Sequence, residues 1–108
     1  MMIEDNLKIA KLIDTYGVLL TSKQLEIMSS YYFDNLTLSE IAVNFKISRQ
    51  AVNDCIAQAT KVLVNFEDKL QLVKKNDNLK VRLNNLKNIV TNEEISDLIS
   101  EILEMLDE

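Results

Sequence analysis

Three side chains that can read nucleic-acid bases follow a serine in the middle of the chain: Arg49, Gln50 and Asn53 come after Ser48. Arginine pairs with guanine, and glutamine or asparagine pairs with adenine, through hydrogen bonds to base edges in the major groove. A serine here caps a helix, and the N-terminus of a helix favours phosphate. The pattern predicts a helix whose first turn contacts nucleic acid. Three lysines are candidates for further phosphate contacts: Lys23, Lys46 and Lys61.

The composition argues against catalysis. The chain has no histidine and one cysteine, Cys55, which excludes histidine-based acid–base catalysis, Cys/His zinc sites and an internal disulfide. A phosphate-binding loop needs several glycines, and Gly17 is the only one. Acidic residues near the C-terminus alternate with apolar ones, as on the wet face of a helix rather than in a metal cage. We therefore expect no catalytic residue, metal, cofactor or small-molecule substrate, and no enzyme.

Charge is distributed unevenly along the chain. The formal net charge of −5 argues against a general nucleic-acid binder. Residues 46–90 nevertheless carry nine bases and four acids, whereas residues 91–108 carry seven acids and no base. The acidic segment is either a solvated helix face or an element that competes for the basic middle of the chain.

A helix-turn-helix over residues 38–60 would hold the base-reading side chains in place. This motif needs a short first helix, a tight turn and a second helix packed across the first. The small side chain of Ala42 permits the close crossing, and the turn is expected at residues 45–47. Apolar residues at suitable spacing fill the angle between the helices: Ile41, Phe45, Ile47, Val52 and either Cys55 or Ile56.

The remaining pattern predicts an all-α fold of about six helices in a single domain, residues 1–108. With no proline and one glycine, the chain lacks the turn formers that an all-β domain needs. A helix over residues 3–16 should end at Gly17, in the left-handed conformation that glycine adopts without cost. Capping boxes predict helix starts after Thr21, Thr37 and Thr91.

One helix is expected to be unusually long. From Ser48 onward no helix breaker occurs until Asn76, so the helix should run to about residue 75, with two C-terminal helices in residues 78–106. Its apolar positions alternate by three and four residues, as in a coiled coil. The stripe packs against the C-terminal helices, against a second copy in a homodimer, or against both. The candidate packing residues are Leu63, Phe66, Leu70, Val73, Leu98 and Ile102.

The motifs resemble two known groups of proteins. Residues 21–63 resemble the helix-turn-helix of region 4 in bacterial sigma factors. Over nearly the whole chain, the pieces LIDTYGVLLTSKQLEIMSSYY, LSEIA and ISRQAVNDCI are similar to the YlxM family. These are small bacterial helix-turn-helix proteins whose gene typically neighbours that of Ffh, the GTPase of the signal recognition particle. The resemblance implies a regulatory, non-enzymatic protein that acts in this pathway by binding the GTPase or the particle's RNA.

Two departures from the family pattern bear on binding. Relatives usually have glycine in the turn, where this chain has Lys46, so a left-handed backbone would be strained there or the turn differs. The later positions of the second helix are often basic or aromatic in relatives. Here they are Asn53, Asp54, Ala57 and Gln58. Because few cations are available for phosphates, binding by a monomer should be weak and strongly salt-dependent.

Three functions remain open at this point. The first is the accessory protein of the signal recognition particle pathway. The second is a dimeric transcription regulator that places residues 48–57 in the major groove of DNA. The third is a helical dimer of purely structural role. The sequence has neither a basic, apolar leader nor about 18 consecutive apolar residues, so we expect a cytoplasmic protein without a membrane span.

Overall fold

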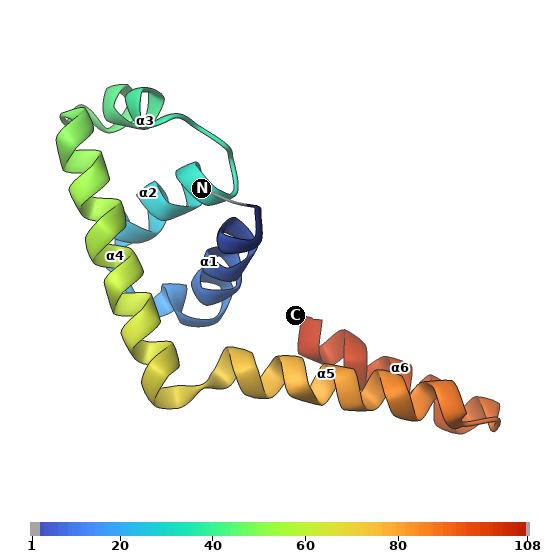
Figure 1. The fold of residues 1–108 in the computed structure, drawn as a ribbon. Helices are drawn as coiled ribbons and strands as arrows, with labels where there is room; N and C mark the ends of the chain where they lie inside the picture. The colour runs from blue at the N-terminus through green and yellow to red at the C-terminus, as the bar shows by residue number, and fades with distance from the viewer. Residues whose placement is uncertain (1–2, 108) are drawn as a thin grey trace. The chain divides into compact units, whose positions relative to one another are not determined.

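The computed structural model describes residues 3–107, and within them all regular structure is helical (Figure 1). This confirms the predicted all-α fold. The helices are α1 (Ile3–Tyr16), α2 (Ser22–Tyr32), α3 (Leu38–Phe45), α4 (Arg49–Leu70), α5 (Leu72–Ile89) and α6 (Glu93–Asp107), with a short 3₁₀ helix at Gly17–Leu19. None of these helices is both long enough and apolar enough to cross a membrane.

The chain divides into two compact units, one ending at Gln71 and one starting at Leu72, where the sequence predicts a single helical domain. In the first unit α4 packs against α1, α2 and α3 (Figure 1). All four helices contribute to its core. The buried side chains are Leu12, Ile13, Tyr16, Leu20, Ile27, Met28, Ile41, Ala42, Val52, Ala59 and Leu63.

Helix α1 is tied to the C-terminal half of α4 by Tyr16. Its hydroxyl donates a hydrogen bond of 2.6 Å to Glu67 Oε1, which satisfies the polar end of a buried side chain. Its ring stacks on Phe66 with 6.0 Å between the ring centroids. Leu63 is fully buried one turn earlier. Leu63 and Phe66 therefore pack within this unit of the chain itself.

The predicted capping boxes at Thr21 and Thr37 are confirmed. Thr21 Oγ1 accepts from the backbone N–H of Gln24, whose side chain accepts from the N–H of Thr21. Thr37 and Glu40 form the same pair of hydrogen bonds. The prediction at Thr91 is wrong by one residue, because Asn92 Oδ1 accepts from the N–H of Ile95 and caps α6 instead.

The role predicted for Gly17 is wrong. Its φ is not positive, and it begins the 3₁₀ helix rather than forming a left-handed cap. The glycine is explained by close packing. A Cβ at this position would lie 3.0 Å from Leu25 Cδ1 and 3.5 Å from Ile13 Cγ2, so any other residue would require the Leu25 side chain to shift.

The long helix is also shorter than predicted. It ends at Leu70, not near residue 75, because Gln71 adopts the left-handed conformation with φ 54° and donates its N–H to Glu67 O. This is a left-handed C-terminal cap with a residue other than glycine. The stripe expected on one helix is therefore divided, and Val73 belongs to α5.

The second unit is a hairpin of α5 and α6. Asn76 Nδ2 donates to Leu106 O at 3.3 Å, and Lys80 Nζ lies 2.6 Å from Asp107 Oδ1, so the helices run antiparallel. The prediction that Asn76 interrupts a helix is wrong, since its side chain instead joins the two helices. Within residues 72–107 the one buried side chain is Ile99.

Candidate nucleic-acid interface

The turn between α3 and α4 is a Schellman motif built around Lys46. Lys46 has φ 57° and ψ 43°, which is the left-handed conformation. Its N–H bonds to Val43 O at 3.3 Å, and the N–H of Ile47 bonds to Ala42 O at 3.1 Å. These are the two hydrogen bonds that define the motif. The tight bend predicted at residues 45–47 is present, and lysine holds the left-handed position that glycine most often fills in this motif.

This turn allows the stability and binding roles of Lys46 to be separated. A residue other than glycine destabilises the folded state by about 1–2 kcal/mol when it adopts the left-handed conformation. Glycine avoids this strain, but it loses more chain entropy on folding, which offsets about 0.5–1 kcal/mol of the gain. Lys46→Gly should therefore raise the free energy of unfolding by about 0.5–1 kcal/mol, measured by urea denaturation. If Lys46 contacts phosphate, the same variant should reduce the salt slope of nucleic-acid binding by about 1. Lys46→Arg is the control that keeps the charge, and a stability equal to or below that of the wild type in Lys46→Gly would contradict the account.

An apolar cluster fixes the angle between the two helices of the motif. Ile27, Ile41, Ala42 and Val52 form its buried centre. Partly buried residues surround them: Tyr31, Leu36, Leu38, Phe45, Ile47, Cys55 and Ile56. All the apolar residues predicted to fill this angle belong to the cluster. Burial raises the pKa of the Cys55 thiol, and the nearby Lys23 ammonium partly opposes this shift.

The first turn of α4 begins with the predicted serine cap. Ser48 Oγ accepts from the N–H of Ala51 at 3.0 Å. Arg49, Gln50 and Asn53 are all exposed, as are Ser48 and Lys46. The structure thus brings the side chains predicted to read bases and one candidate phosphate contact together at one end of α4. The helix N-terminus adds a partial positive charge to this end.

One contact inside this surface was not predicted from the sequence. Gln50 Nε2 donates a hydrogen bond of 2.8 Å to Asp54 Oδ1 on the next turn of α4. The spacing of four residues is the signal that could have indicated it. This bond uses one of the two N–H donors of the Gln50 amide and places an exposed carboxylate beside it, which disfavours base reading by Gln50 and phosphate binding nearby.

Of the other two candidate lysines, Lys61 lies well beyond the first turn of α4 and Lys23 lies on a different helix. Lys61 is twelve residues beyond Arg49 on α4, about 18 Å along the helix axis. Lys23 is in the first turn of α2, close enough to Cys55 for its charge to affect that thiol. Arg49, Lys23 and Lys61 therefore do not form one compact cluster.

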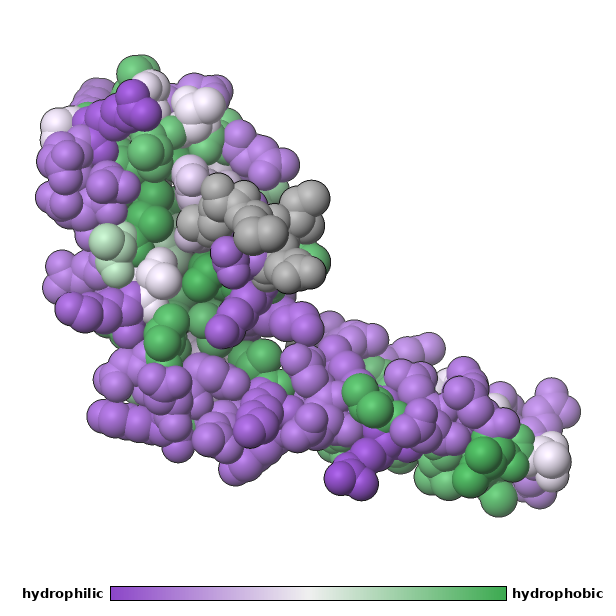
Figure 2. All heavy atoms as spheres, viewed as in Figure 1, coloured by the Kyte–Doolittle hydropathy of each residue, from purple (hydrophilic) through white to green (hydrophobic). Residues whose placement is uncertain are grey.

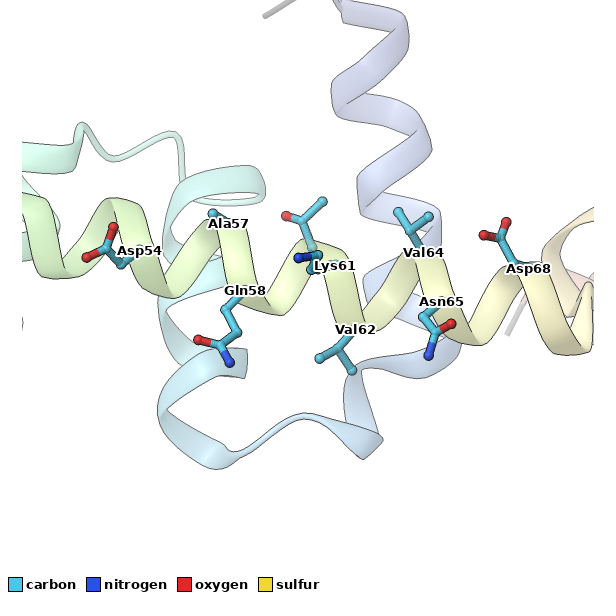
Figure 3. A pocket seen from close by; sticks show the side chains of 9 residues that line it. Asp54, Ala57, Gln58, Lys61, Val62, Val64, Asn65 and Asp68 are labelled. Carbon is cyan, nitrogen blue, oxygen red and sulfur yellow. The ribbon is translucent and has the colours of Figure 1, made fainter.

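A shallow pocket follows the outer face of α4 beyond the first turn (Figure 3). Asp54, Lys61 and Asp68 supply its charges, so carboxylates outnumber the ammonium group there. This charge balance does not favour phosphate. Along α4, the side chains suited to nucleic acid are therefore concentrated at its N-terminal end. No cluster of three metal-ligating side chains occurs in residues 3–107.

Comparisons with known proteins agree with this geometry. Residues 3–106 match a family model, UPF0122, described as "Putative helix-turn-helix protein, YlxM / p13 like". The chain is 43% identical to the UPF0122 protein YlxM of Bacillus subtilis, over 99% of this chain and 100% of that protein. It is 43% identical to a UPF0122 protein of Clostridium perfringens (94% and 95% covered) and 35% identical to one of Fusobacterium nucleatum (95% and 100% covered).

These matches define a family of helix-turn-helix proteins rather than of enzymes. They cover both units of the chain, so the resemblance extends beyond the helix-turn-helix to the C-terminal hairpin. The chain belongs to the UPF0122 family of YlxM-like helix-turn-helix proteins.

Proposed function

We propose that this chain is a non-enzymatic regulatory protein of the cytoplasm that binds the RNA of the signal recognition particle, or the particle's GTPase, through its helix-turn-helix. One observation carries the nucleic-acid part of the proposal. Arg49, Gln50 and Asn53 are exposed at a capped helix N-terminus that a Schellman turn and a packed apolar cluster hold in position. The link to the particle rests on the resemblance to the YlxM family.

The charges around this end of α4 predict weak, salt-dependent binding. Each phosphate contact contributes to affinity by releasing counterions, and the contacts available here are few. Lys46 and Arg49 lie at the capped end, whereas Lys61 is about three turns away. Because the salt slope scales with the number of phosphates that the protein neutralises, these few contacts should give a shallow slope of about two to three phosphates, rather than the strong salt dependence expected from the sequence.

The experiment is a fluorescence-anisotropy titration of the signal recognition particle RNA and of random duplex DNA, each at two salt concentrations. We expect the chain to bind the RNA more tightly than the DNA at both salt concentrations. A parallel pull-down from cell extract measures recovery of the particle's GTPase. Failure to bind the RNA together with absence of the GTPase would contradict the proposal.

A second candidate function is a homodimeric transcription regulator, and the side-chain types favour it. Arginine, glutamine and asparagine are the residues that read base edges in the major groove, and dimers reach two half-sites one helical turn apart. In this function residues 48–57 lie in the major groove of DNA. Selection from random duplex DNA at low salt should then enrich a two-fold symmetric sequence. An unenriched pool would reject this function and leave the first in place.

Removing the Asp54 carboxylate should improve nucleic-acid binding by either function. A charge about 8 Å from a phosphate in water contributes about 0.5 kcal/mol, so Asp54→Asn should tighten binding about two- to threefold. Asp54→Ala removes the charge and also releases the Gln50 amide. Anisotropy titrations compare both with Asp68→Asn, which removes a carboxylate at the far end of the same helix. An equal gain in the Asp68 variant would show a non-local charge effect and contradict the local account.

A further inference from the structure

The C-terminal hairpin carries an apolar face of evenly spaced side chains, which we call the hairpin face. On α5 it consists of Leu72, Leu79 and Leu86, and on α6 of Ile95 and Ile102. Each follows the previous one on its helix by seven residues. Their exposed fractions are all between 42% and 47%. Figure 2 shows apolar side chains gathered over the end of this hairpin.

The two helices present these side chains on the same side of the hairpin. Lys80 contacts α6, and Leu79 directly precedes it. Leu103 is half-buried on α6, and Ile102 directly precedes it. A two-fold axis perpendicular to the plane of two antiparallel helices relates one helix to the other and leaves each side of the plane unchanged. Neighbouring residues are about 100° apart around a helix, so the residue just before a contact residue lies on the same side of this plane in both helices. Val81, which follows Lys80, lies on the opposite side.

The hairpin is too small to be stable with this face in water. It contains 37 residues, and the one buried side chain described in it is Ile99. Units below about 40 residues usually need a disulfide, a metal or oligomerisation to fold. The hairpin contains no cysteine and no histidine. Covering the apolar face would therefore add to the stability of the hairpin.

The charges indicate what covers it. Helix α5 carries five bases and one acid, whereas α6 carries six acids and no base. A second hairpin placed face to face, with its α6 on α5, brings opposite charges together at both edges. The alternative pairing of α5 with α5 and α6 with α6 brings like charges together and costs energy.

We propose that the hairpin face is a homodimer interface, in which the hairpins of two copies form an antiparallel four-helix bundle with α5 of each copy on α6 of the other. If the chain is a homodimeric transcription regulator, the hairpin face is the surface through which its two copies associate. The proposal concerns the hairpin alone and requires no nucleic acid. Its failure would therefore leave the binding experiments on the helix-turn-helix unaffected.

The first test is sedimentation equilibrium of the full chain between 1 and 200 µM, with the two variants Leu79→Glu and Val81→Glu. The wild type should be a dimer in this range. A charge buried in the hairpin face should raise the dimer dissociation constant by about 100-fold or more, whereas the same change at Val81 should alter it by less than about threefold. A monomeric wild type, or equal effects of the two variants, would overturn the proposal.

The second test does not depend on how well a glutamate variant folds. In a Cys55→Ala background, Leu79→Cys with one affinity tag is mixed with Ile102→Cys carrying another, and the mixture is oxidised. Cross-linked dimers that carry both tags are the expected product. Cross-links only between two Leu79→Cys chains, or no more cross-linking than Val81→Cys gives with Ile102→Cys, would overturn the arrangement.

Discussion

Replacing Ile41 by alanine is expected to lower the free energy of unfolding by about 2–5 kcal/mol. Ile41 is fully buried at the centre of the cluster that fixes the angle between α3 and α4. Truncation removes three methyl or methylene groups and leaves a cavity among Ile27, Ala42 and Val52 that these residues cannot close without moving the helices. Urea denaturation followed by circular dichroism measures the change.

Val43→Ala is the matched control on the same helix. Val43 is 77% exposed, so its truncation should change the stability by less than about 0.5 kcal/mol. A loss of similar size in both variants would mean that α3 is not held by this cluster. The turn and its exposed end would then lack the support on which the proposed function depends.

Replacing Arg49 by alanine is expected to weaken binding of the preferred nucleic acid by about 1–3 kcal/mol, or roughly five- to 150-fold. Arg49 is exposed in the first turn of α4, where its guanidinium can form two hydrogen bonds with one base. Because no core packing is lost, the free energy of unfolding should change by less than about 0.5 kcal/mol. Fluorescence anisotropy and urea denaturation of the same preparation give both quantities.

Lys69→Ala is the control for charge. It removes one positive charge from the last turn of α4, at the other end of the same helix. The affinity of the Lys69→Ala variant for the nucleic acid should fall by less than about threefold, and only at low salt. If both variants lose affinity equally, binding depends on net charge and not on the capped end of α4.

The starts of α2, α3 and α4 could be predicted, because caps are local in sequence. Thr21 and Thr37 bond to residues three positions away, and Ser48 does the same with Ala51, so the residue types alone predict the helix starts. The spacing of apolar residues likewise predicted which side of α4 meets α3. These interactions need no knowledge of distant parts of the chain.

The end of α4 could not be predicted from the same signals. Gln71 and Lys46 both adopt the left-handed conformation that glycine usually supplies, and nothing in a glutamine marks such a cap. Gly17 is the reverse case. It is not left-handed, and its close contacts with Leu25 and Ile13 explain why a glycine is present. Asn76 continues a helix because its side chain bonds to Leu106 across the hairpin. The errors at Gly17 and Asn76 thus involve contacts between residues far apart in the chain or on different helices.

The candidate site was predictable in position but not in detail. Helical spacing predicts that Arg49, Gln50 and Asn53 are exposed together, and they are. It does not by itself predict that the Gln50 amide bonds to Asp54 rather than remaining available to a base. That contact depends on side-chain conformation and changes how the surface is expected to bind.

The most direct test of the central claim is a titration of the isotope-labelled protein with the signal recognition particle RNA, followed by amide chemical shifts. The account predicts that the largest shift changes lie at residues 46–54, the turn and the first turns of α4. Largest changes in α5 or in α1, or no changes at saturating RNA and low salt, would contradict it.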